Sequence, residues 1–200
     1  MNAELATALS DAPLALLASG LAWHLWSRRA VSRPLARPLA WFFAGVAASA
    51  ALGGAWHATR TMLPPAVAAA GWKLTLVAIG FSNAALLAAF ATATVLASHR
   101  GIVTVVIVAK LGVFLAFAFT RDAFLPAVQD QLGALVAGLL ILGWDRLRGG
   151  SLPTAPLVDG IGLAIVSGSI QDASMDVTSW LNHNVLYHLV AMAALVAFWR

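Results

Sequence analysis

The sequence predicts an all-α integral membrane protein, a single domain of about seven transmembrane helices over residues 1–200. Of the 200 residues, 61% are hydrophobic and only 10% are charged, whereas soluble domains carry about 25% charged residues. A helix that crosses the hydrocarbon layer needs roughly 20 apolar residues, so the chain has room for about seven crossings joined by short loops. Its apolar runs are rich in Leu and Ala, which favours helices over the strands of a barrel.

Seven apolar runs mark the expected helices. They cover residues 13–26, 39–57, a stretch within 66–97, 102–119, 127–144, 156–171 and 184–199. The third run is longer than a bilayer requires, so we expect that helix to tilt or to protrude. The first, fifth and sixth runs are short or weakly bounded, so six crossings remain an alternative to seven.

The basic residues predict the orientation. With the N-terminus outside, eight basic residues lie inside and three lie outside; the inner ones are Arg28, Arg29, Arg33, Arg37, Arg100, Arg146, Arg148 and Arg200, and the outer ones are Arg60, Lys73 and Arg121. Cytoplasmic loops carry an excess of Lys and Arg. We therefore expect the protein to lie in the plasma membrane, or the bacterial inner membrane, with the N-terminus on the outer side and the C-terminus on the cytoplasmic side. This topology accounts for the net charge of +4 without a nucleic-acid partner.

Three histidines are expected at the outer face, although they come from distant parts of the sequence. His57 ends the second span, and His183 and His188 stand at the start of the last one. Imidazole is a common metal ligand, and a catalytic zinc needs three or four ligands with one open position. These histidines are therefore candidate metal ligands, with membrane-interface anchors as the alternative. Asn184 and His188 share a helix face, so His183 can join them only if the helix begins after it.

Two short stretches resemble a known family. AALGGAWHAT at the end of the second span and NHNVLYHLV at the start of the last one are similar to motifs of the alkaline ceramidase and adiponectin-receptor superfamily of seven-helix membrane hydrolases, and are closer still to uncharacterised bacterial members. In that superfamily, zinc is held by a histidine of helix two and an H-x-x-x-H pair of helix seven. The resemblance assigns His57 and His188 to two of these positions, Asn184 to the third, and Gly53 to the position of a site serine. The family's aspartate on helix three has no counterpart here.

The resemblance implies a zinc-dependent hydrolase that acts on a lipid amide or ester at the outer leaflet. Zinc would lower the pKa of its bound water and polarise the scissile carbonyl. Asp172 or Asp176 would act as general base, or, like His183, would replace the missing ligand. Asp11, which enters the first span from outside, is expected either to reach the same cavity or to be an exposed N-cap.

Two other functions fit the same residues. A b-type haem with His57 and His188 as axial ligands would make the protein an electron carrier. A non-catalytic bundle that serves as a partner or receptor is the third reading, and the positions that depart from the family signature favour it. The absence of cysteine excludes disulfides, thiolate metal sites and cysteine nucleophiles.

Overall fold

The chain folds into seven α-helices over the residues that the structure, a computed structural model, describes: 3–27, 35–94, 99–121, 123–150, 152 and 154–200. The helices are α1 (Ala3–Ser27), α2 (Ala36–Thr59), α3 (Pro65–Thr94), α4 (Arg100–Thr120), α5 (Leu125–Leu147), α6 (Thr154–Asp172) and α7 (His183–Trp199). The predicted all-α class is confirmed for this part of the chain. Five helices, α1 to α5, are long and apolar enough to cross a membrane, and α7 is apolar but shorter.

The predicted spans fall within these helices, with one exception and one clear error. The end expected for the third span, and Arg28, Arg29 and Arg33, lie outside the described residues. The error concerns the first helix, which begins at Ala3 rather than at Pro13. The N-cap alternative for Asp11 is therefore wrong, because Asp11 lies inside α1 and is buried. The apolar run did not indicate the start at Ala3, because α1 begins with polar residues whose partners lie on other helices.

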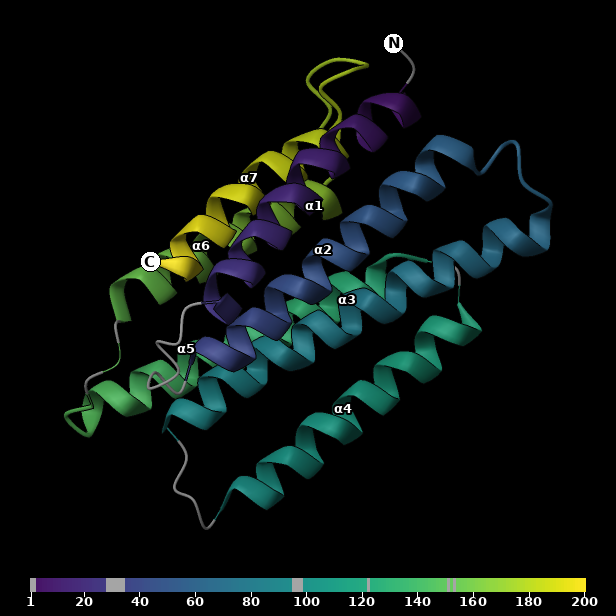
Figure 1. Cartoon of the computed structure of the whole chain (residues 1–200). Helices are drawn as coiled ribbons and strands as arrows, with labels where there is room; N and C mark the ends of the chain where they lie inside the picture. The colour runs from purple at the N-terminus through teal and green to yellow at the C-terminus, as the bar shows by residue number, and fades with distance from the viewer. Residues whose placement is uncertain (1–2, 28–34, 95–98, 122, 151, 153) are drawn as a thin grey trace.

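Six helices form a closed ring in the order α1–α2–α3–α5–α6–α7, and α7 packs back against α1 (Figure 1). Helix α4 lies outside the ring and packs against α3 and α5. The start of α1 and the α2–α3, α4–α5 and α6–α7 connections lie at one end of the bundle (Figure 1). We call this end the histidine end, because His57 and the start of α7 belong to it.

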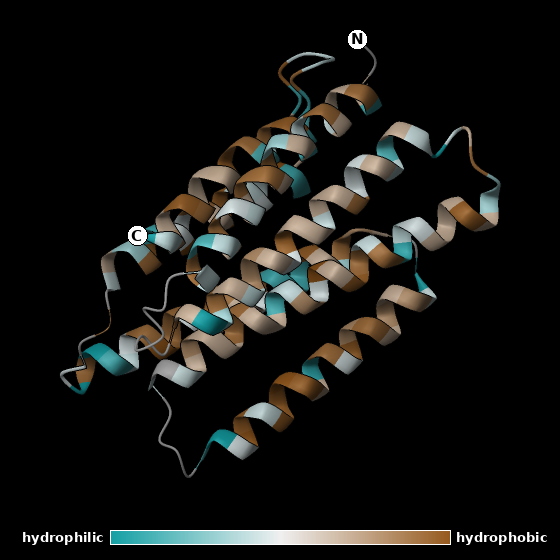
Figure 2. Cartoon of the chain, viewed as in Figure 1, coloured by the Kyte–Doolittle hydropathy of each residue, from teal (hydrophilic) through white to brown (hydrophobic). Residues whose placement is uncertain are grey.

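The outer surface of the bundle is strongly apolar, as Figure 2 shows for α4 over most of its length. Large side chains on α4 are more than half exposed, among them Ile102, Val105, Val106, Val108, Val113 and Phe119. An apolar surface of this extent is far larger than a monomeric protein in water sustains. It suits a helix surrounded by lipid.

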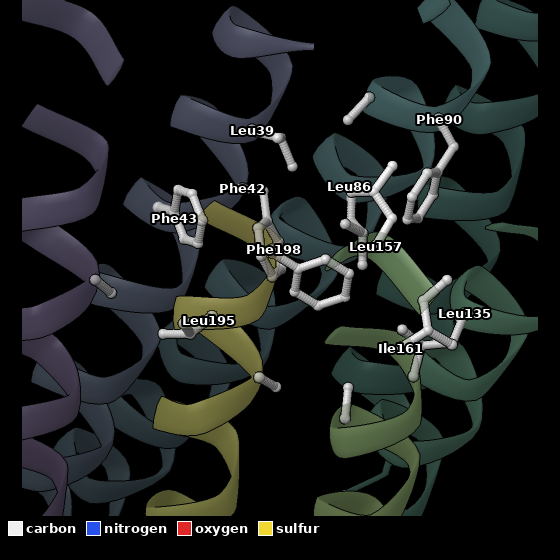
Figure 3. Packing of buried hydrophobic residues seen from close by; sticks show 14 of the residues in the cluster. Leu39, Phe42, Phe43, Leu86, Phe90, Leu135, Leu157, Ile161, Leu195 and Phe198 are labelled. Atoms are coloured by element: carbon white, nitrogen blue, oxygen red, sulfur yellow. The ribbon is translucent and has the colours of Figure 1, made fainter. Parts of the chain in front are cut away.

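The largest hydrophobic cluster lies inside the ring, away from the histidine end. Figure 3 shows how Phe42 of α2 and Phe198 of α7 meet within it, with ring centroids 5.7 Å apart in an edge-to-face arrangement. Leu86 of α3 and Leu135 of α5 belong to the same cluster. The cluster therefore joins helices from opposite sides of the ring. It lines the ring interior on the side away from the histidine end.

A polar contact fixes α4 to the ring. Lys110 of α4 donates to Asp130 Oδ1 of α5 at 2.5 Å, and the Asn83 amide of α3 donates to Asp130 Oδ2 at 2.9 Å. The Asp130 side chain is only 8% exposed. A buried carboxylate needs partners in an apolar surrounding, so this contact sets the depth and rotation of α4.

We predict that Lys110→Met destabilises the protein, because it leaves the Asp130 carboxylate without its cation. Removing one partner of a buried pair costs 3–5 kcal/mol, and the partial exposure of Lys110 reduces this to about 2 kcal/mol. Thermal unfolding in detergent would measure the loss. Val108→Met, on an exposed site of the same helix, is the matched control, and Lys110→Met/Asp130→Asn is expected to recover stability. An unchanged midpoint for Lys110→Met would contradict the assignment.

Candidate functional site

A cavity of about 290 Å³ lies inside the ring and extends from the histidine end toward the hydrophobic cluster. All six ring helices line it. Its polar lining includes Asp11, Ser49, His57, Thr75, Ser82, Asn83, Gln131, Ser167, Gln171, His183, Asn184, Tyr187 and His188. Its apolar lining includes Leu14, Phe42, Leu86, Leu135, Leu195 and Phe198, which also belong to the hydrophobic cluster. The cavity therefore has the chemical gradient of an amphiphile, with polar groups near one end and hydrocarbon at the other.

His188 is the most buried of the cavity's histidines and connects α7 to α1. Its Nδ1 atom lies 2.7 Å from Ser10 Oγ, and its Nε2 atom lies 3.2 Å from Asp11 Oδ1. The side chains of His188 and Asp11 are 9% and 6% exposed. Both ring nitrogens therefore face α1, which holds the imidazole in one orientation.

Two glycines of α2 make room for Asp11. A Cβ atom at Gly54 would lie 2.8 Å from Asp11 Cβ, whereas one at Gly53 would lie 3.8 Å from Asp11 Oδ2, an ordinary contact distance. Only a residue without a side chain allows α1 to approach α2 this closely at position 54. Gly53 thus borders the space around the Asp11 carboxyl group.

His57 is held by a carboxylate from α1. Its Nδ1 atom lies 2.8 Å from Glu4 Oε2, and Arg60 donates to the other carboxylate oxygen of Glu4 at 2.5 Å. A carboxylate at Nδ1 selects the tautomer with the hydrogen on that nitrogen and leaves Nε2 as a base. Among the described residues, no hydrogen-bond partner stands at His57 Nε2.

His183 is the first residue of α7 and is oriented by the α6–α7 connection. Asp176 Oδ1 accepts from the His183 backbone N–H at 2.7 Å and lies 2.8 Å from its Nδ1. The hydrogen bond from the His183 backbone, followed by the one from its side chain, contributes most to holding the pKa of Asp176 below its ordinary value of 3.8. Asn182 caps the helix, because its side chain accepts from Val185 N. The cap lets His183 line the cavity from the helix end, although the helix begins at His183 and not after it.

Asn184 lines the cavity, and a hydrogen bond from α6 fixes its side-chain amide. Gln171 of α6 donates from Nε2 to Asn184 Oδ1 at 2.9 Å. This bond fixes the amide, and its Nδ2–H groups have no partner within the described part of the chain. Asn184 can therefore donate to an oxygen atom inside the cavity.

In this arrangement the ring nitrogens of His188 are directed to protein partners. Neither ring nitrogen of His188 points to a position where it could bind a metal together with the other histidines. Nδ1 contacts Ser10, and Nε2 contacts Asp11. In the described ranges, no group of three His, Asp or Glu side chains is placed to hold a metal ion. Zinc and haem b stay predictions from the sequence.

The structure brings together most of the residues that the sequence singled out. His57, His183, His188, Asp11 and Asn184 all line the one cavity. Asp172 instead lines a second cavity of about 240 Å³ between α5 and α6, and Asp176 contacts His183. The catalytic roles predicted for these two aspartates stay predictions.

Sequence reasoning missed Glu4, Ser10 and Gln171 as residues of the site. One signal was present for Glu4. Glu4 and Asp11 stand at i and i+7, which places them on one face of a helix, and two acids on one face of an apolar helix indicate a polar contact. Ser10 and Gln171 gave no such signal, because single polar residues near helix ends are common.

The comparisons with known proteins add a family and no function. A family of unknown function, DUF6962, matches residues 6–200. No curated protein matches the chain, and no solved structure does.

We predict that the His183 contact with Asp176 is retained from neutral pH down to about 4. A carboxylate whose pKa is lowered stabilises the fold above its ordinary pKa of 3.8 and loses this effect as the pH falls toward the lowered value. Protection of the His183 amide in hydrogen exchange would measure it. Asp176→Asn should abolish the protection and Asp172→Asn should not. Protection that fades well above pH 4, or that survives Asp176→Asn, would contradict the prediction.

Proposed function

Since the chain belongs to DUF6962, a family of unknown function, we propose its function from its own geometry: a membrane hydrolase that cleaves an amide or ester bond of a single-chain lipid. The observation that carries the proposal is the cavity. Its apolar part suits an acyl chain, and its polar end holds a histidine–carboxylate pair where the carbonyl of such a lipid would lie.

The orientation of the protein in the membrane is part of the same proposal. With the N-terminus outside, the histidine end lies at the headgroup depth of the outer leaflet of the plasma membrane, or of the bacterial inner membrane. A lipid would then enter with its chain toward the hydrophobic cluster. The carbonyl would stay near His57 and Asn184, both of which line the cavity.

His57 is the general base of the proposed reaction. Glu4 holds the hydrogen on Nδ1, so Nε2 takes a proton from a water molecule as the water oxygen attacks the carbonyl carbon. The resulting oxyanion accepts a hydrogen bond from the Asn184 amide, which Gln171 fixes. When the carbon–nitrogen or carbon–oxygen bond breaks, the His57 imidazolium returns the proton to the leaving amine or alcohol. All atoms and protons are accounted for without a further group.

We expect purified protein in nanodiscs to release dodecanoic acid from a dodecanoyl amide or ester, and we expect His57→Ala to be slower by roughly 100-fold to 10,000-fold, the range that general-base catalysis supplies. Glu4→Gln should be slower by at least about tenfold, because it loosens the tautomer and orientation of the base. Quantifying the released acid by mass spectrometry measures both.

His24→Ala is the matched control, because His24 lies on α1 near its other end and contacts Trp199. It should keep the wild-type rate. A rate that His57→Ala leaves unchanged would contradict the role of His57. Loss of activity on chelation, restored by zinc, would instead favour the metal that the family resemblance implies.

A further inference from the structure

Within the described part of the chain, two residues that line the cavity carry a buried oxygen atom without a hydrogen-bond partner: Asp11 at Oδ2 and Gln171 at Oε1. The Asp11 oxygen belongs to a carboxyl group and is the stronger acceptor of the two. Asp11 borders the cavity, its side chain is 6% exposed, and its Oδ2 atom accepts no hydrogen bond from the residues that the structure describes. The nearby hydroxyl of Thr75 does not serve it, because that group donates to Gly71 O of its own helix at 3.1 Å. A buried acceptor without a donor is costly, and native proteins rarely keep one without a function.

The hydrogens around His188 show what kind of acceptor Oδ2 is. The Ser10 hydroxyl lies 2.8 Å from Thr7 O, and a carbonyl oxygen cannot donate, so Ser10 supplies that hydrogen. Ser10 Oγ must then accept from His188 Nδ1–H, and we assign the tautomer on this basis. A hydrogen is also required between His188 Nε2 and Asp11 Oδ1, because two lone pairs at 3.2 Å would repel.

This assignment gives the pair a net charge of zero. The hydrogen between the two residues resides on Asp11 or on His188, and in either case the charges of the pair cancel. Oδ2 is therefore an acceptor in a neutral unit. It suits a neutral N–H or O–H group better than an ammonium, whose charge would stay uncompensated in an apolar surrounding.

Resting on the proposed function, we propose that Asp11 determines specificity by accepting a hydrogen bond, through Oδ2, from an N–H or O–H group next to the carbonyl of the bound lipid. The cavity thereby prefers lipids with an unsubstituted donor at this position. Asp11 selects the ligand, whereas His57 carries the proposed proton transfer, so the two roles are separable.

The test compares two probes that share a chain and a carbonyl. Dodecanamide carries N–H donors, and N,N-dimethyldodecanamide carries none. Their dissociation constants are obtained from the thermal stabilisation of detergent-purified full-length protein, since a ligand that binds only the folded state raises its stability. We expect wild type to bind dodecanamide at least about tenfold tighter, as one hydrogen bond to a buried acceptor provides.

Three variants separate the explanations. Asp11→Leu removes the acceptor at similar size and should abolish the preference. Asp11→Asn should keep it, because its amide N–H can donate to His188 Nε2 while its oxygen takes the place of Oδ2. Tyr187→Phe should also keep it, because Tyr187 lines the cavity but makes no hydrogen bond to Asp11 Oδ2.

The outcomes are distinct. A preference that survives in Asp11→Leu overturns the role of Asp11 but leaves lipid binding intact. A preference lost equally in Asp11→Asn and Asp11→Leu contradicts the neutral acceptor. If neither amide stabilises wild type, lipid binding itself is contradicted, and this inference with it.

A further variant keeps the test decisive if Asp11→Leu does not fold. Gly53→Ala places a methyl group 3.8 Å from Asp11 Oδ2, 3.9 Å from Asp11 Oδ1 and 3.6 Å from Thr75 Cγ2, all ordinary contacts. We therefore expect the Asp11 contact with His188 to persist, while the methyl group occupies space that a ligand donor needs beside the carboxyl group. We expect the preference to fall by at least about threefold, and an unchanged preference would overturn the proposal.

Discussion

Polar contacts from α1 to its two neighbours are the constraint on which the site depends. A buried carboxyl group such as that of Asp11, which is 6% exposed, needs a partner on another helix because little water reaches it. Glu4 finds His57 on α2, and Asp11 finds His188 on α7. These contacts fix the rotation of α1 and close the ring around the cavity. Removing α1 from this position would leave both imidazoles without the groups that orient them.

The same constraint divides the bundle into a polar end and an apolar interior. Around the cavity, each histidine is oriented at Nδ1 by an oxygen atom: Glu4 for His57, Asp176 for His183 and Ser10 for His188. Farther from the histidine end, aromatic and aliphatic side chains pack against one another inside the ring (Figure 3). The proposed lipid hydrolase would use this combination of an oriented imidazole and an apolar cavity.

The sequence predicted the helices well and the contacts between them poorly. An apolar run shows the length of a helix but not which of its faces meets a neighbour. The length of an apolar run determines a helix, so the expected spans lie inside the observed helices except at the described limit of α3. A helix that is apolar on all sides does not reveal its rotation, so the partner of Lys110, which is Asp130, was not predictable. His57 and His188 were found because both stand at span ends. Glu4 was not, because its spacing with Asp11 indicates a polar contact but does not identify His57 as the partner until α1 is placed against α2.

Chemical cross-linking tests the central claim, the contact of α1 with α2 at the histidine end, most directly. The chain contains no cysteine, so Glu4→Cys/His57→Cys carries the only two thiols, and Glu4→Cys/His24→Cys places two thiols near opposite ends of α1 as a control. In native membranes, a short thiol-specific cross-linker should join positions 4 and 57 and not positions 4 and 24, as seen by mass spectrometry. Absence of the 4–57 cross-link, with both thiols shown to be reactive, would contradict the arrangement and the function derived from it.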